Sequence, residues 1–172
     1  VCPIDLFAGE GETPEYKQIN PLGALPALEV DGKIMLESGA MCHWLTDYHA
    51  ESGLAPGIED GDRMQYEQWM MFSQATLEMQ PWLIILHSKI LPQSQRVEGI
   101  IPWAEQRYQG ILKVLNDALG EDEYFVGNRF TTADIMLGST LMFMPETLTA
   151  FPALIAYTER LMKRSAFQRA SQ

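Results

Sequence analysis

Asn20-Pro21-Leu22-Gly23-Ala24-Leu25-Pro26-Ala27-Leu28 is a loop that leads through an X-Pro bond into an expected strand. Pro26 lacks a backbone donor, which suits a turn or the first residue of a strand. The dipeptide Asp31-Gly32 follows between two short apolar runs and is a strong signal for a two-residue hairpin. Glu37 and Ser38 come next and precede apolar residues at helical spacing, which predicts the start of a helix.

The residues around this segment predict a small α/β domain over residues 1–50. Val1–Phe7 has the pattern of a strand, and Thr13-Pro14-Glu15 is typical of a helix start, with an N-cap, a proline and an acid. That helix must end before Pro21. The expected order is strand, helix, strand, strand, helix.

The rest of the chain predicts an all-helical domain. Residues 51–61 combine glycine, proline and acidic residues, which indicates a linker, and residues 62–172 contain no convincing strand pattern. We expect one helix from Arg63 to about Leu77. Another is indicated by an apolar stripe that begins at Ile101 and is ended by Gly120, and its members are Ile101, Ala104, Tyr108, Ile111, Leu112, Leu115 and Leu119.

A capping box is expected in the helical domain. Thr131 is placed to cap a helix, and Asp134, three residues later, can bond back to the cap. Phe130 and Ile135 stand where a hydrophobic staple would close. Loss of such a cap typically costs about 1 kcal/mol. A last helix is expected from about residue 152 to residue 163.

Composition limits the class of protein and its partners. The chain has 172 residues, 47% hydrophobic and 20% charged, which excludes a disordered chain. Twelve basic against 23 acidic residues give a net charge of −11, so nucleic acid and anionic membranes are not expected partners. Two cysteines, Cys2 and Cys42, make no disulfide framework, and we expect a reduced, cytoplasmic setting. The three histidines lie outside zinc-site spacings, so no metal is expected.

The residues at the two ends of the hairpin indicate a site for a small peptide. If the Leu25-Pro26 bond is cis, the carbonyl and amide of Leu25 face outward, and a ligand can pair with them as an extra strand does. Ser38 and the amides that open its helix can bind an anion, and Glu37 can hold an ammonium group. The alternatives are a plain trans proline and an ordinary N-cap beside a surface acid.

Taken together, these motifs resemble the glutathione transferase superfamily, of the cytosolic and bacterial-like type. That family carries Asn-Pro-x-Gly-x-Val-Pro-x-Leu before its hairpin and Glu-Ser-x-Ala after it, matched here by Asn20–Leu28 and Glu37–Ala40. It also carries a Ser/Thr-x-x-Asp capping box, matched by Thr131 and Asp134. The resemblance implies a partial thioredoxin-like domain followed by an all-helical domain, with the capping box in a structural role.

The resemblance also implies a role for each matched residue. The backbone of Leu25, with Pro26 cis, would pair with the cysteinyl part of glutathione. Glu37 and Ser38 would hold the γ-glutamyl amine and carboxylate. The helical domain would supply a pocket for the electrophile, and its candidate residues are Tyr66, Trp69, Met70, Phe72 and Tyr108. Core packing is the alternative role for these aromatic and Met side chains.

Two departures from the family pattern bear on the site. Many relatives have a basic or amide residue, which reaches the glycyl carboxylate, where this chain has Ala24; Lys17 is a possible substitute. The family fold opens with a strand and helix whose connecting loop carries the catalytic Tyr, Ser or Cys, and we expect that segment to precede Val1. The catalytic residue is therefore unknown, and neither Cys2 nor Cys42 occupies the right loop.

The resemblance implies an enzyme that transfers the thiolate of glutathione to a hydrophobic electrophile, commonly as a homodimer. Two alternatives remain open. One is a non-catalytic transferase-like module for assembly or protein contacts. The other is a glutathione-dependent isomerase or disulfide reductase, which the residues of this chain do not distinguish from a transferase.

Overall fold

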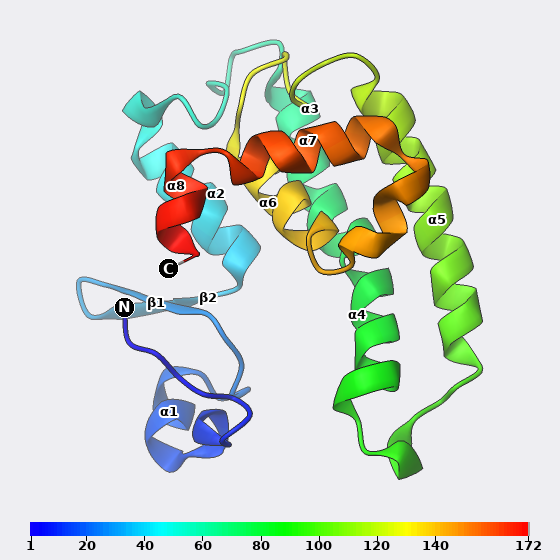
Figure 1. The fold of residues 1–172 in the computed structure, drawn as a ribbon. Helices are drawn as coiled ribbons and strands as arrows, with labels where there is room; N and C mark the ends of the chain where they lie inside the picture. The colour runs from blue at the N-terminus through cyan, green and yellow to red at the C-terminus, as the bar shows by residue number, and fades with distance from the viewer. Residues whose placement is uncertain (172) are drawn as a thin grey trace. The chain divides into compact units, whose positions relative to one another are not determined.

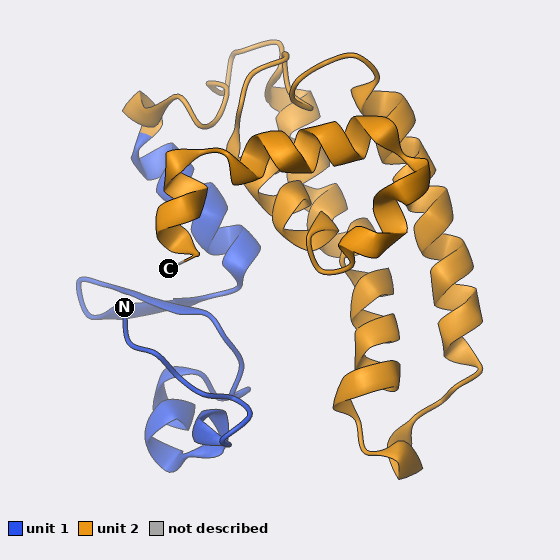
Figure 2. Cartoon of the chain, in the orientation of Figure 1, with its two compact units in different colours: residues 1–49 blue, residues 50–172 orange. Residues whose placement is uncertain are grey.

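Residues 1–49 form one unit of the chain and residues 50–172 form another (Figure 2). The computed structural model describes residues 1–171. The first unit contains a two-stranded sheet and two helices, and the second is helical throughout its regular elements (Figure 1). A thioredoxin-like α/β part followed by an all-helical part is the predicted fold class. Within the described residues, no helix is long and apolar enough to cross a membrane.

The first unit is built around a tight hairpin. Its elements are α1 (Pro14–Ile19), β1 (Ala27–Val30), β2 (Lys33–Leu36) and α2 (Ser38–Tyr48). Asp31 and Gly32 both adopt positive φ, at 51° and 75°, as a two-residue turn with the twist of its strands requires. The strands pair antiparallel from Val30↔Lys33 at the turn to Ala27↔Leu36 at the open end. The hairpin predicted from Asp31-Gly32 is therefore confirmed.

Helix α1 begins as its sequence predicts. The Thr13 hydroxyl accepts a hydrogen bond from the Tyr16 amide at 3.3 Å, and Pro14 occupies the first helical position. The helix ends at Ile19, before Pro21.

The strand expected at Val1–Phe7 is not formed. Residues 1–5 have no regular structure, and residues 6–9 make a turn. One carboxylate oxygen of Asp5 accepts hydrogen bonds from the amides of Phe7 and Ala8, at 2.9 and 3.0 Å, which bends the chain. A strand also requires a neighbour for its amides and carbonyls, and the sheet of the described residues contains only β1 and β2.

The second unit consists of helices α3 to α8 joined by loops and short helical segments. The helices are α3 (Arg63–Phe72), α4 (Met79–Ile85), α5 (Ile100–Leu119), α6 (Thr132–Leu141), α7 (Pro152–Met162) and α8 (Ser165–Ala170). A π-helical turn, Ser73–Leu77, connects α3 to α4, so the helix expected from Arg63 continues beyond its predicted end. Helix α5 packs along α4 and buries the predicted apolar stripe from Ala104 to Leu119.

The predicted capping box ties three segments of the second unit together. One Asp134 carboxylate oxygen accepts from the Thr131 amide and hydroxyl, at 2.7 and 3.1 Å. The other accepts from the Phe125 amide and the Tyr157 hydroxyl, at 3.2 and 3.0 Å. Asp134 is fully buried, and burial raises the pKa of its carboxyl although the hydrogen bonds oppose that shift. One side chain therefore joins the start of α6 to α7 and to the segment before α6.

Replacing Asp134 with Asn should destabilise the second unit. The substitution removes the charge and turns one acceptor into a donor that faces donors, so we expect a loss of about 2–3 kcal/mol in unfolding free energy. Urea denaturation followed by circular dichroism measures it. The matched control is Asp117→Asn, which removes an exposed ion pair with Lys113 and should change stability by about 0.5 kcal/mol or less. Equal losses in the two variants would contradict the structural role of Asp134.

Candidate functional site

The open end of the hairpin brings the two sequence motifs together. Because Ala27 pairs with Leu36, Pro26 just before β1 and Glu37 just after β2 lie at the same open end of the hairpin. The Leu25-Pro26 bond and the start of α2 therefore border one site within the first unit.

The backbone that leads into this site is held by two side chains. The Tyr16 hydroxyl and the Asn20 side-chain amide both donate to the carbonyl oxygen of Ala24, at 2.8 and 2.7 Å. The Asn20 side-chain oxygen also accepts from the Leu22 amide at 3.0 Å. Asn20 is only 3% exposed. These bonds fix the peptide that precedes Leu25.

Two glycines allow this loop to fold closely on the turn before α1. A Cβ atom on Gly11 would lie 2.4 Å from the Gly23 carbonyl oxygen, which is too close for any side chain. Gly23 also has a φ of 67°, which L-residues rarely adopt. The backbone of the loop at Gly23 therefore packs directly against the backbone at Gly11.

The Leu25-Pro26 peptide bond is cis, as the family resemblance implies. Leu25 is 44% exposed, and its amide and carbonyl make no hydrogen bond with any residue from 1 to 171. The backbone of Leu25 is therefore open to a ligand that offers a donor and an acceptor of its own.

Glu37 is held in a strained conformation. Its φ of 72° and ψ of 107° lie in a region that non-glycine residues avoid, at a cost of about 1–3 kcal/mol. Its side chain is exposed and makes no cap hydrogen bond to α2. A glycine would adopt this conformation without strain. The backbone conformation at position 37 alone would therefore favour glycine, yet the chain has a glutamate there.

Ser38 opens α2 and is half-buried. The Glu37 carbonyl accepts the first helical hydrogen bond, from the Met41 amide at 2.9 Å. The amides of Ser38, Gly39 and Ala40 precede that bond and have no partner within the helix. Together with the Ser38 hydroxyl they can bind an anion beside the Glu37 carboxylate, so the pair suits a group that carries both charges.

Lys17 and Cys42, which the sequence analysis also considered, both lie in helices of the first unit. The Lys17 ammonium lies 2.7 Å from the Glu12 carboxylate, so it is already engaged in an ion pair. Burial raises the pKa of the Cys42 thiol in α2, which reduces its thiolate fraction. Neither observation gives these residues a part in the site.

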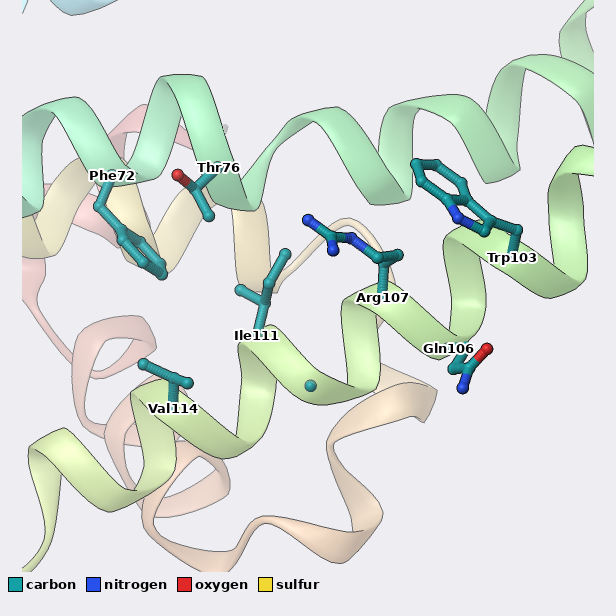
Figure 3. Close-up of a pocket in the computed structure, with 8 residues that line it drawn as sticks. Phe72, Thr76, Trp103, Gln106, Arg107, Ile111 and Val114 are labelled. Atoms are coloured by element: carbon teal, nitrogen blue, oxygen red, sulfur yellow. The ribbon is translucent and has the colours of Figure 1, made fainter.

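Most residues suggested for an electrophile pocket lie in the core of the second unit. At most 5% of their surface is exposed, and they are Tyr66, Trp69, Met70 and Tyr108. Burial raises the pKa of Tyr108 to about 12. Phe72 is different, because it lines a shallow groove of about 490 Å³ with residues of α5 (Figure 3). Trp103 and Arg107 form another part of that groove, with the guanidinium carbon 5.8 Å from the centre of the Trp103 ring.

Sequence reasoning missed the residues that position the site. Asn20 belongs to the motif Asn20–Leu28, but the motif assigns no role to its side chain, and no sequence pattern assigns a role to Tyr16 or Gly11 in this site. The available signal was the glycine on either side of α1, Gly11 and Gly23, because glycine is the usual residue where backbone approaches closely. The partner of the Tyr16 hydroxyl depends on how the loop returns to α1, and no local pattern encodes it.

Comparison with known proteins matches both units to one family. The sequence profile of the glutathione S-transferase N-terminal domain matches residues 1–53, and that of the C-terminal domain matches residues 91–169. A probable maleylacetoacetate isomerase 1 of Drosophila melanogaster is 23% identical over 96% of this chain and 66% of its own length. Glutathione S-transferase F9 of Arabidopsis thaliana is 30% identical over 77% of this chain and 63% of its own length.

A solved structure of a possible glutathione S-transferase from Rhodopseudomonas palustris agrees with these matches. It superposes with a TM-score of 0.80 at 27% identity, over 95% of this chain and 74% of that one. The chain thus spans slightly less than two thirds of the length of the two curated relatives.

Replacing Asn20 with Ala should loosen the loop before Leu25. The change removes two hydrogen bonds of a buried side chain, each worth about 1 kcal/mol. We expect amide hydrogen exchange to speed up by ten-fold or more in a peptide that covers residues 21–26. Gln18→Ala on the exposed side of α1 is the control and should leave that exchange unchanged. Similar exchange in the two variants would mean that Asn20 does not hold the loop.

Proposed function

The chain belongs to the glutathione transferase superfamily, and on that premise we propose that it binds glutathione at the open end of its hairpin and presents the thiol to a hydrophobic electrophile. The strained Glu37 carries this proposal. A carboxylate kept at a strained, exposed position has no packing or capping role within the described residues, whereas a ligand ammonium would give it one.

The γ-glutamyl end of glutathione suits the start of α2. Its ammonium group would pair with the Glu37 carboxylate, and its carboxylate would accept from the Ser38 hydroxyl and the first amides of the helix. The cysteinyl part would lie along Leu25 and pair with its free amide and carbonyl, as an added strand does. Tyr16 and Asn20 would keep that backbone in place through the Ala24 carbonyl.

The remaining parts of the activity follow the family. Glutathione is the co-substrate, and catalysis would rest on positioning and on lowering the pKa of its thiol. We do not assign any residue of this chain to lowering the pKa of the glutathione thiol. Phe72 would contact the electrophile, and Tyr66, Trp69, Met70 and Tyr108 would shape the pocket from the core. A homodimer in the cytoplasm is the proposed state, and size-exclusion chromatography with light scattering tests the dimer.

Removing the Glu37 charge should weaken glutathione binding. A charged hydrogen bond to an ammonium is worth about 1.5–3 kcal/mol, so Glu37→Gln should lower the affinity about ten-fold or more in isothermal titration calorimetry. Ser38→Ala should also lower it and should reduce retention on glutathione resin. Glu29→Gln is the control, because Glu29 is an exposed acid on β1 of the same hairpin. Equal affinity in the Glu37 and Glu29 variants would overturn the proposed site.

Glu37→Gly should separate stability from binding. Glycine relieves the strained φ, so the variant should be at least as stable as the original chain in urea denaturation. Without the carboxylate it should nevertheless bind glutathione as weakly as Glu37→Gln. A variant that is clearly less stable would show that Glu37 is retained for folding instead of binding.

A glutathione-dependent isomerase is the second candidate, because a relative matched over most of this chain is named a probable maleylacetoacetate isomerase. Both reactions use the same glutathione site and differ in the second substrate. Parallel assays of halonitroarene conjugation, maleyl-type isomerisation and mixed-disulfide reduction distinguish them. Glutathione binding without turnover in any of the three would favour a non-catalytic module.

A further inference from the structure

The two ends of the proposed glutathione site differ in their chemistry. With the γ-glutamyl end at Glu37, on the Pro26 side of Leu25, the ligand continues past Leu25 toward Ala24 and Gly23. We call this second part of the site its far end. Glutathione places its glycyl carboxylate there. The side chain of Ala24 is a methyl group, so it offers no donor to that carboxylate.

The two lysines of the first unit do not supply the missing positive charge. The Lys17 ammonium lies 2.7 Å from the Glu12 carboxylate, so an ion pair already neutralises it. Lys33 pairs with Val30 at the turn of the hairpin, and the site lies at the opposite end of the strands. Residues 1–49 contain no arginine. No unpaired lysine or arginine of this unit therefore lies at the far end.

An acid lies beside the far end instead. One carboxylate oxygen of Glu12 is so close to the loop that a Cβ atom on Gly23 would lie 2.9 Å from it. Residues 1–24 contain four acidic residues and one basic residue, Lys17. A negative local charge of this kind repels a carboxylate and attracts a cation. The far end therefore disfavours the negative charge with which glutathione terminates.

Leu25 also borders a shallow hollow that can receive the end of the ligand. Its volume is about 390 Å³, and Leu25 and residues 3–7 line it. Asp5 is the one ionisable residue in this lining. One oxygen of its carboxylate accepts from two backbone amides, and the other accepts no hydrogen bond within residues 1–171. The hollow therefore suits a group that donates hydrogen bonds, such as an amide or an ammonium.

From these observations, and on the premise of the proposed glutathione site, we propose that the site prefers a γ-glutamylcysteinyl thiol whose far end is a neutral or positively charged amide. Recognition rests on the γ-glutamyl and cysteinyl parts, which meet Glu37, Ser38 and the backbone of Leu25. The far end is selected by charge, because Glu12 and Asp5 favour a donor and no free cation of the first unit binds a carboxylate.

Three thiols that differ only at the far end test this preference. They are glutathione, its C-terminal amide and its 2-aminoethyl amide, which end in a negative, a neutral and a positive group. Calorimetric titration of the full chain should give affinities that rise in this order, with the aminoethyl amide about five-fold or more above glutathione at low salt. The preference should shrink at high salt, because salt screens exposed charges. Equal affinities, or tightest binding of glutathione, would overturn the proposal.

Substitutions of the ion pair locate the preference. Glu12→Gln removes the acid beside Gly23 and frees the Lys17 ammonium, so glutathione should bind about three-fold or more tightly and the preference for the amides should fall. Glu29→Gln removes the same charge from an exposed position on β1 and should preserve the preference. Lys17→Gln should leave glutathione affinity unchanged. A loss of about five-fold or more in that variant would show that Lys17 binds the glycyl carboxylate, and the proposal would be wrong.

Glu37→Gln separates this inference from the proposed function. The substitution should weaken all three thiols by the same factor, because they share the γ-glutamyl ammonium. Binding that depends on Glu37 but favours glutathione over its amides would contradict the charge selection and leave the proposed site intact. Failure of all three thiols to bind would overturn both the proposed function and this preference.

Discussion

The carbonyl oxygen of Ala24 accepts hydrogen bonds from both Tyr16 and Asn20, and the candidate site depends on this contact. The two donors come from α1 and from the residue that ends it, so they tie the loop to the helix. Gly11 and Gly23 make room for the same contact by letting backbone meet backbone. The loop therefore places Leu25 at the end of the hairpin, and the Leu25 amide and carbonyl make no hydrogen bond within residues 1–171.

The hairpin supplies the other half of the site. Its register places Pro26 and Glu37 at the same end of the hairpin, and α2 begins at the residue after Glu37. The first unit thus offers a peptide ligand with a charged amino-acid end three kinds of group: the backbone of Leu25, the Glu37 carboxylate and the first amides of α2. Each of these groups is common in proteins. The strain at Glu37 is what distinguishes this arrangement from a plain helix cap.

The sequence was most informative where local chemistry decides the structure. Asp31-Gly32 predicted the hairpin turn, Thr131 and Asp134 predicted the capping box, and the stripe ending at Leu119 predicted α5. The failures came from interactions that the periodicity of the sequence does not describe. Val1–Phe7 has a strand pattern, but a strand forms only beside a partner, and the Asp5 side chain bends the chain instead. The role of Tyr16 depends on a returning loop, which periodicity does not describe.

Nuclear magnetic resonance of the ¹⁵N-labelled chain during a glutathione titration tests the central claim most directly. The account predicts that the largest amide shifts appear at Leu25 and from Glu37 to Ala40, and that they saturate together with one affinity. Shifts that are absent, or that are confined to the helical unit, would contradict a glutathione site at the end of the hairpin.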